Sequence, residues 1–112
     1  MSKKVYLTNY MIIRCIVERG KAQKVFESTQ NVGAISATIY YARGTGIREQ
    51  MGLLGITVEA EKEVIEVVVP KDIAEHIFDV MVDVGELHLP GKGFIYMSES
   101  IKALTYIPSR EE

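Results

Sequence analysis

The fold is decided by residues 63–85, which read EVIEVVVPKDIAEHIFDVMVDVG. The first seven residues are rich in valine and isoleucine and end at Pro70, which predicts a short buried strand. Beyond Pro70 the apolar residues change to helical spacing, and Gly85 ends the pattern. We therefore predict a strand over 63–69 and a helix after it. The apolar stripe of that helix is formed by Ile73, Ile77, Val80, Met81 and Val84.

A similar strand and helix occur earlier in the chain. Residues 10–17 read YMIIRCIV, an apolar run interrupted only by Arg14, and they predict another buried strand. The sequence Glu18-Arg19-Gly20 breaks it. Apolar residues then recur with helical spacing from Lys21, and Gly33 stops the pattern. Residues 34–43 carry β-branched and aromatic side chains and predict a further strand.

Working outward to the C-terminus, residues 94–97 predict a fourth strand, and residues 101–107 are consistent with one more. The order is strand, helix, strand, a loop, then strand, helix, strand. This order predicts an α+β fold of the ferredoxin-like βαββαβ type. Two helices would pack on one face of an antiparallel sheet, within a single domain over 1–112.

The other face of that sheet has no cover in this arrangement. Residues 12–17 and 64–69 are nevertheless apolar at successive positions, which indicates burial on both sides. The simplest cover is another copy of the chain. We therefore expect a closed homo-oligomer whose sheet faces meet.

Composition narrows the class of protein. The formal net charge is −2, with no clustered basic face, so we expect no nucleic-acid partner. The single cysteine, Cys15, excludes a disulfide within the chain and favours a reducing compartment. No signal peptide or membrane span is recognisable, so we expect a cytoplasmic protein. No catalytic constellation is evident, and we expect no enzyme activity.

Two glycine motifs are candidates for ligand binding. Residues 43–46, Arg-Gly-Thr-Gly, open a long loop over 44–57, and Arg48 lies just beyond. Residues 90–94, Pro-Gly-Lys-Gly-Phe, precede the fourth strand. Glycines let a backbone approach a ligand closely, and consecutive amides can cradle an anion. The loop interior carries Met51, Leu53 and Leu54, which either fold onto the sheet or dock a partner protein.

The spacing of these residues is similar to that of a known family over about Tyr10 to Tyr106. The chain resembles the P-II nitrogen-regulatory family, and the first nine residues form an N-terminal extension beyond the usual start of that family. Matching positions include Ile16, Val25, Gly33, Thr38, Arg43-Gly44-Thr45-Gly46, Lys62, Glu66, Val67-Val68-Val69-Pro70, Asp72-Ile73, Gly91 and Gly93.

The resemblance implies a trimer that binds an adenylyl nucleotide between subunits and controls a partner through a mobile T-loop. Thr38, Glu66 and Val68 would line the adenine side, and Gly91 and Gly93 would wrap the phosphates. A membrane transporter is the partner class it points to. The implied ligand-binding residues are Thr38, Gly44, Thr45, Gly46, Arg48, Lys62, Glu66, Val68, Gly91, Lys92 and Gly93, and the implied docking residues are Met51, Leu53 and Leu54.

The chain also departs from the family pattern on the phosphate side. Phe94 stands where the family has a lysine, Leu104 and Tyr106 where it has two arginines, and Arg48 where it has a metal-linked glutamine. Fewer cations weaken recognition of a triphosphate, which favours AMP or ADP over ATP. The alternative is a trimer similar to the CutA family, which would bind a metal or act structurally.

Overall fold

The structure is a computed structural model and describes residues 2–34, 36–44 and 60–108. Its strands are β1 (Ser2–Leu7), β2 (Tyr10–Glu18), β3 (Ser36–Gly44), β4 (Ala60–Pro70), β5 (Gly93–Ser100) and β6 (Ala103–Pro108). Its helices are α1 (Ala22–Gln30) and α3 (Ala74–Val84), and a 3-10 turn, η2 (Lys71–Ile73), leads into α3.

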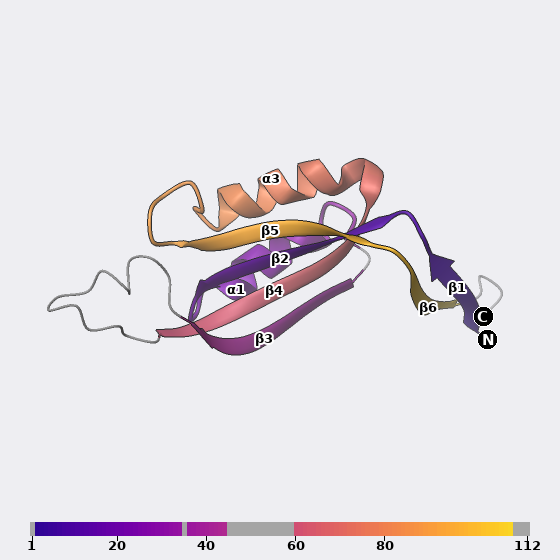
Figure 1. The fold of residues 1–112 in the computed structure, drawn as a ribbon, viewed down its shortest axis with the longest axis horizontal. Coiled ribbons are helices and arrows are strands. Elements are labelled where there is room, and N and C mark those ends of the chain that lie inside the picture. Colours follow the sequence, from indigo (N-terminus) through magenta and orange to yellow (C-terminus); the bar gives the residue numbers. More distant parts are fainter. Residues whose placement is uncertain (1, 35, 45–59, 109–112) are drawn as a thin grey trace, which may run out of the picture.

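The main sheet has four strands in the order β3-β4-β2-β5, and every neighbouring pair is antiparallel. Both helices lie on one face of this sheet (Figure 1). This is the ferredoxin-like arrangement that the sequence predicts. The predicted helix after Pro70 differs in one detail, since its first turn is the 3-10 turn η2 and the α-helix begins at Ala74.

The core lies between the sheet and the helices. Alternate residues of the two central strands point into it, because side chains of a strand alternate between its faces. The fully buried members include Ile13, Cys15, Val17, Ile65, Val67, Val69, Val25, Ile77 and Met81. Burial raises the pKa of the Cys15 thiol to about 12, so this residue acts as a small apolar core residue.

The opposite face of the sheet is open within one copy of the chain. It carries the other set of alternate residues, including Arg14 and Glu66 at its centre. Phe94, Tyr96 and Tyr40 also lie there, with 63%, 38% and 40% of their surface exposed. The two outer strands, β3 and β5, therefore expose large aromatic side chains on this face, as expected of a sheet face on which nothing packs.

A second, two-stranded sheet lies beyond the main one. The N-terminal strand β1 pairs with the C-terminal strand β6, and we call this pair the ribbon. It projects past the end of the main sheet, at the end opposite to the paired residues Gly44 and Ala60 (Figure 1). The sequence indicates the strand over 101–107 but not its partner β1. In β1 the two lysines Lys3 and Lys4 leave an apolar run too short to predict a strand.

Candidate functional site

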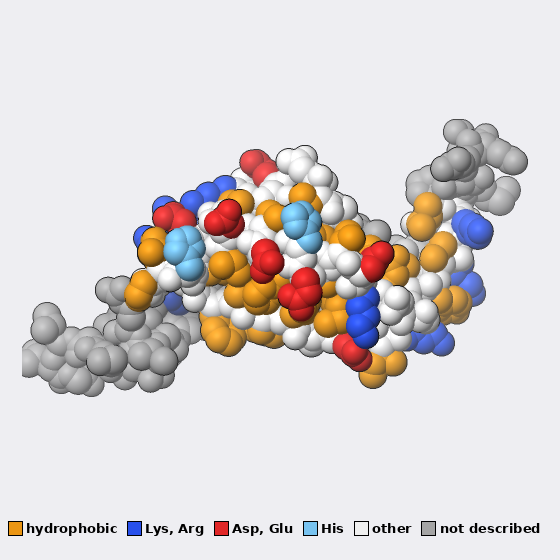
Figure 2. All heavy atoms as spheres, turned by 90° about the horizontal axis from the view of Figure 1, so that it is seen from above, with side chains coloured by type: hydrophobic (Ala, Val, Ile, Leu, Met, Phe, Trp, Pro, Cys, Tyr) orange, Lys and Arg blue, Asp and Glu red, His pale blue; other side chains and the backbone are white. Residues whose placement is uncertain are grey.

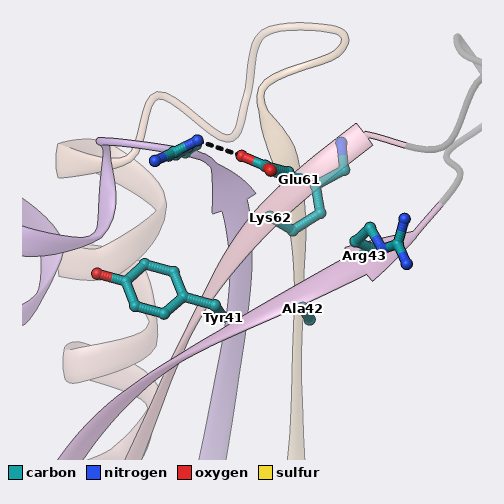
Figure 3. A pocket seen from close by; sticks show the side chains of 6 residues that line it. Tyr41, Ala42, Arg43, Glu61 and Lys62 are labelled. Atoms are coloured by element: carbon teal, nitrogen blue, oxygen red, sulfur yellow. Dashed lines mark hydrogen bonds and ion pairs between the residues drawn. The ribbon is translucent and has the colours of Figure 1, made fainter.

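The candidate site is a surface pocket at the base of the loop that joins β3 and β4. It has a volume of about 480 Å³ and is lined by Arg19, Tyr41, Ala42, Arg43, Glu61 and Lys62. Figure 3 shows these side chains at the end of the paired strands β3 and β4. Three of the six lining residues are cations, so the pocket suits an anionic ligand.

Each side of the pocket comes from a different part of the chain. Tyr41, Ala42 and Arg43 end β3, and Glu61 and Lys62 begin β4; Ala42 is paired with Lys62 in the ladder. Arg19 comes from the turn between β2 and α1. Its guanidinium donates to the Glu61 carboxylate across the pocket (Figure 3). This pair is exposed, so solvent weakens it and an anion can compete for Arg19.

A buried carboxylate fixes the turn that carries Arg19. Glu63 is only 9% exposed, and its Oε1 accepts hydrogen bonds from the backbone N–H groups of Gly20 and Ala22, both at 2.9 Å. These N–H groups lie at the start of α1, where no side chain of the helix itself caps them. A carboxylate there is also favoured by the helix dipole.

The residues predicted for the adenine side lie elsewhere, on the open face of the sheet. Glu66 pairs with Thr38 on one side and with Arg14 on the other. Arg14 Nε donates to Glu66 Oε2 at 2.6 Å, and this hydrogen bond raises the pKa of Arg14. The Arg14 guanidinium also lies 5.9 Å from the ring centre of Tyr96. Thr38, Glu66, Arg14 and Tyr96 therefore form one row across all four strands.

The second glycine motif lies at the same end of the sheet as the pocket. Gly93 begins β5 and pairs with Val17, which pairs in turn with Glu63. Two strands thus separate Gly93 from β3, a distance of about 14 Å. Within one copy of the chain, the two glycine motifs therefore flank the end of the sheet rather than meet.

Gly93 has a structural reason to be glycine. Its φ is +153°, and a Cβ atom there would lie 2.2 Å from the carbonyl oxygen of Ile16 and 2.9 Å from the Leu87 side chain. Gly44 differs, because a Cβ atom there would meet nothing within 4 Å. The close approach of β5 to β2 thus accounts for Gly93 without a ligand.

The predicted site residues fall into separate groups. Lys62 lines the pocket and Gly44 follows its lining residue Arg43, while Gly91, Lys92 and Gly93 lie across the sheet end. Thr45, Gly46, Arg48, Met51, Leu53 and Leu54 lie outside the described residues.

Sequence reasoning missed Arg19, Tyr41, Arg43 and Glu61 as a group. Arg43 stands in the first glycine motif, which is a usable signal. Arg19 stands in the segment that ends the first predicted strand, and nothing local in the sequence links it to Glu61, 42 residues away.

The described residues offer neither a metal site nor a membrane-spanning helix. No three of their His, Cys, Asp and Glu side chains lie close enough together to hold a metal ion. None of their helices is long and apolar enough to cross a membrane.

The strand order and the two helices on one face define an α+β domain of the ferredoxin-like class. The family model for nitrogen regulatory protein P-II matches residues 11–105, and the chain belongs to the P-II family. Members of this family are signalling regulators rather than enzymes, and they form trimers that bind small ligands and target proteins.

Among solved structures, the chain is similar to Arabidopsis thaliana PII in its crystal structure bound to citrate. The TM-score is 0.62 at 20% sequence identity, with 80% of this chain and 76% of that chain covered. This similarity supports the fold. A search of curated proteins finds no match.

Proposed function

We propose that this chain is a P-II signalling protein that binds an anionic small ligand, an adenylyl nucleotide, beside the base of its 44–57 loop. It acts through a partner protein and not through catalysis. The observation that carries the proposal is the gathering of Arg19, Arg43 and Lys62 around one pocket next to Gly44. A pocket of about 480 Å³ is large enough for a nucleotide-sized ligand.

The number of cations favours a ligand of modest charge. Arg19 is already paired with Glu61, whose carboxylate also opposes the entry of an anion. A mono- or diphosphate therefore matches the pocket better than a triphosphate, and AMP or ADP are the preferred candidates. The P-II protein of Arabidopsis thaliana binds citrate, a small polyanion, which is consistent with this ligand class.

The adenine side of the site requires more than one copy of the chain. Thr38, Glu66 and Val68 lie on the open sheet face, away from the pocket. We propose that three copies associate through these faces, and that the site forms in the cleft between neighbours, where Gly91, Lys92 and Gly93 join it. Association would also cover the exposed Phe94, Tyr96 and Tyr40.

The signal would pass through the loop. Ligand at its base changes the charge around Arg43 and Lys62, which lie in the two strands that the loop joins. Binding then selects one arrangement of the loop and alters its affinity for a target, in the manner of an order–disorder switch. Through Met51, Leu53 and Leu54 the loop would dock a target protein, and a membrane transporter is the proposed class.

A panel of ligands tests this function. The purified protein is heated with AMP, ADP, ATP, cyclic dinucleotides or divalent metals, and hits are measured by calorimetry. A ligand that binds only the folded state raises the melting temperature. We expect a shift with AMP or ADP. Shifts with metals alone would reject the sensor and support the CutA-like alternative.

Matched variants locate the binding site. Lys62→Gln removes a pocket cation, and Lys24→Gln removes a cation of α1 that pairs with Glu86 at 3.6 Å, outside the pocket. We expect Lys62→Gln to weaken nucleotide binding about tenfold, which corresponds to one lost charge-assisted hydrogen bond. Lys24→Gln should bind as the unsubstituted protein does. Equal binding by both variants would exclude the pocket.

A further inference from the structure

The ribbon exposes apolar side chains far from the pocket. In the part of it that the structure describes, Tyr6, Leu104, Tyr106 and Ile107 are 52%, 50%, 59% and 49% exposed. A two-stranded ribbon is marginally stable in water by itself, since it has little core of its own. The residues that it buries are few: Leu7 is 7% exposed, while Val5 and Thr105 are only half-buried.

The ribbon continues the main sheet without a slip in register. In the main sheet Tyr10 pairs with Ser100, and in the ribbon Leu7 pairs with Ala103. The two intervening residues of each strand, 8–9 and 101–102, match in number. The alternation of side chains is therefore preserved: even-numbered positions form the open face of β2 and β5, and even-numbered positions form the more exposed face of the ribbon.

The even-numbered ribbon face has a definite chemistry. Tyr6 lies at its centre, with the Lys4 Nζ 5.6 Å and the Lys102 Nζ 5.0 Å from its ring centre. Tyr6 pairs with Leu104, and Lys4 pairs with Tyr106. No Asp or Glu occurs in β1 or β6. We call Lys4, Tyr6, Lys102, Leu104 and Tyr106 the aromatic–lysine face.

The rest of the chain has the complementary charge. Residues 10–100 carry 9 of the 13 cationic residues and 13 of the 15 carboxylates, a formal charge of −4; the other two carboxylates, Glu111 and Glu112, follow β6 in the sequence. Viewed from above, Asp and Glu gather over the helical side of the body, whereas the ribbon shows Lys among hydrophobic side chains (Figure 2). The body of a second copy is thus net acidic, whereas β1 and β6 carry lysines and no carboxylate.

We propose that the aromatic–lysine face is a contact between copies of this chain, in which the ribbon of one subunit packs against the body of a neighbour. The inference rests on the proposed homo-oligomer and extends it, because the interface would run from the open sheet face onto the ribbon. Packing there stabilises the ribbon and removes three large apolar side chains from water, and the net acidic body favours the approach of Lys4 and Lys102. The N-terminal strand β1 is thereby an assembly element.

Photo-cross-linking tests the contact directly. Cys15 is fully buried, so a maleimide carrying benzophenone would label only a cysteine introduced on the surface. Leu104→Cys places the label on the aromatic–lysine face, and Ile107→Cys places it on the other ribbon face at nearly equal exposure, 50% against 49%. After irradiation, covalent dimers are counted and their linked peptides are identified by mass spectrometry.

We expect covalent dimers from position 104, with the linked peptide in the body of the other copy, and few from position 107. Equal yields at both positions, or no dimers in a protein that light scattering shows to be oligomeric, would reject the ribbon contact alone. A protein that is monomeric at all concentrations would reject the proposed oligomer as well.

Charge-reversed variants give a second readout. Lys4→Glu lies on the aromatic–lysine face, and Lys3→Glu is its neighbour on the opposite face. We expect Lys4→Glu to raise the dissociation constant of the oligomer about tenfold or more, and Lys3→Glu to change it little. A different result would overturn the proposal. If the intact oligomer binds phosphatidylserine vesicles and Lys4→Glu abolishes that binding, the aromatic–lysine face is exposed in the oligomer and is not a contact between copies.

Discussion

A series of three glycine-to-alanine substitutions separates structural from ligand-binding glycines. Gly44→Ala adds a methyl group in open space at an ordinary φ, so we expect a loss of stability below about 0.5 kcal/mol. Gly20 has a φ of +88° but nothing within 4 Å of a Cβ atom. Gly20→Ala should therefore cost only the left-handed backbone strain, about 1 kcal/mol.

Gly93→Ala combines strain with a collision. Its Cβ atom would lie 2.2 Å from the Ile16 carbonyl oxygen, which belongs to the neighbouring strand, and 2.9 Å from Leu87. The Leu87 side chain can turn away, but the backbone of Ile16 is held in the centre of the sheet. Strain of about 1 kcal/mol and forced displacement of about 2 kcal/mol predict a loss of about 3 kcal/mol.

Urea unfolding at one fixed protein concentration measures the series, and thermal melting gives a parallel reading. Each kcal/mol corresponds to a shift of about 4 °C in a domain of this size. The expected order of stability is Gly44→Ala, then Gly20→Ala, then Gly93→Ala. If Gly93→Ala and Gly44→Ala have the same urea midpoint of unfolding, the close approach of β5 to β2 is refuted. Because Gly44→Ala should leave stability almost unchanged, any loss of nucleotide affinity in this variant would indicate a ligand close to Gly44.

Three further predictions concern buried or central polar groups. Glu63→Gln keeps a carbonyl oxygen for the N–H groups at the start of α1 but loses its charge, and should cost about 1 kcal/mol in urea unfolding; no loss would contradict the cap. Arg14→Met should raise the dissociation constant of the oligomer about tenfold, because it leaves Glu66 without its cation and with only the Tyr40 hydroxyl as a donor at 3.5 Å. Adding Glu66→Met should restore the dissociation constant in light scattering; a double variant as weak as the single one would place the pair outside the interface. The Cys15 thiol ionises near pH 9 when unfolded but near pH 12 when folded, so deprotonation favours the unfolded chain above pH 9. The stability advantage over Cys15→Ala should fall by about 2 kcal/mol between pH 8 and pH 10.5, and a constant difference would refute the burial of the thiol.

The structure also gives the departures from the P-II pattern a physical setting. The sequence predicts that Leu104 and Tyr106 stand where the P-II family has arginines, and in the structure both lie on the same ribbon face as Lys4 and Lys102. Two lysines are thus present on this face, and one of them belongs to the N-terminal strand.

The sequence alone determined the strands and helices of the main layer and their order. The short, β-branched apolar runs at 10–17 and 63–69 predict buried strands, and the helical spacing after each predicts the helices. Pro70 ends β4, and Gly33, with a φ of +103°, follows the end of α1; both act by local chemistry, because each acts on its own backbone. At the end of α3 the positive φ falls on Glu86 and not on the predicted Gly85. The fold class follows from this order and from the way short connections restrict topology.

The tertiary structure alone decided which distant residues meet. Arg19 meets Glu61 because β2 and β4 pair antiparallel, which places the end of β2 beside the start of β4. No local sequence pattern encodes that pairing. Strand β1 forms because β6 offers it a partner about 100 residues later, since two adjacent lysines followed by three apolar residues do not by themselves specify a strand. Preferences for helix, strand or turn depend on residues adjacent in the sequence. The pocket and the ribbon depend instead on strand register, which only the folded chain establishes.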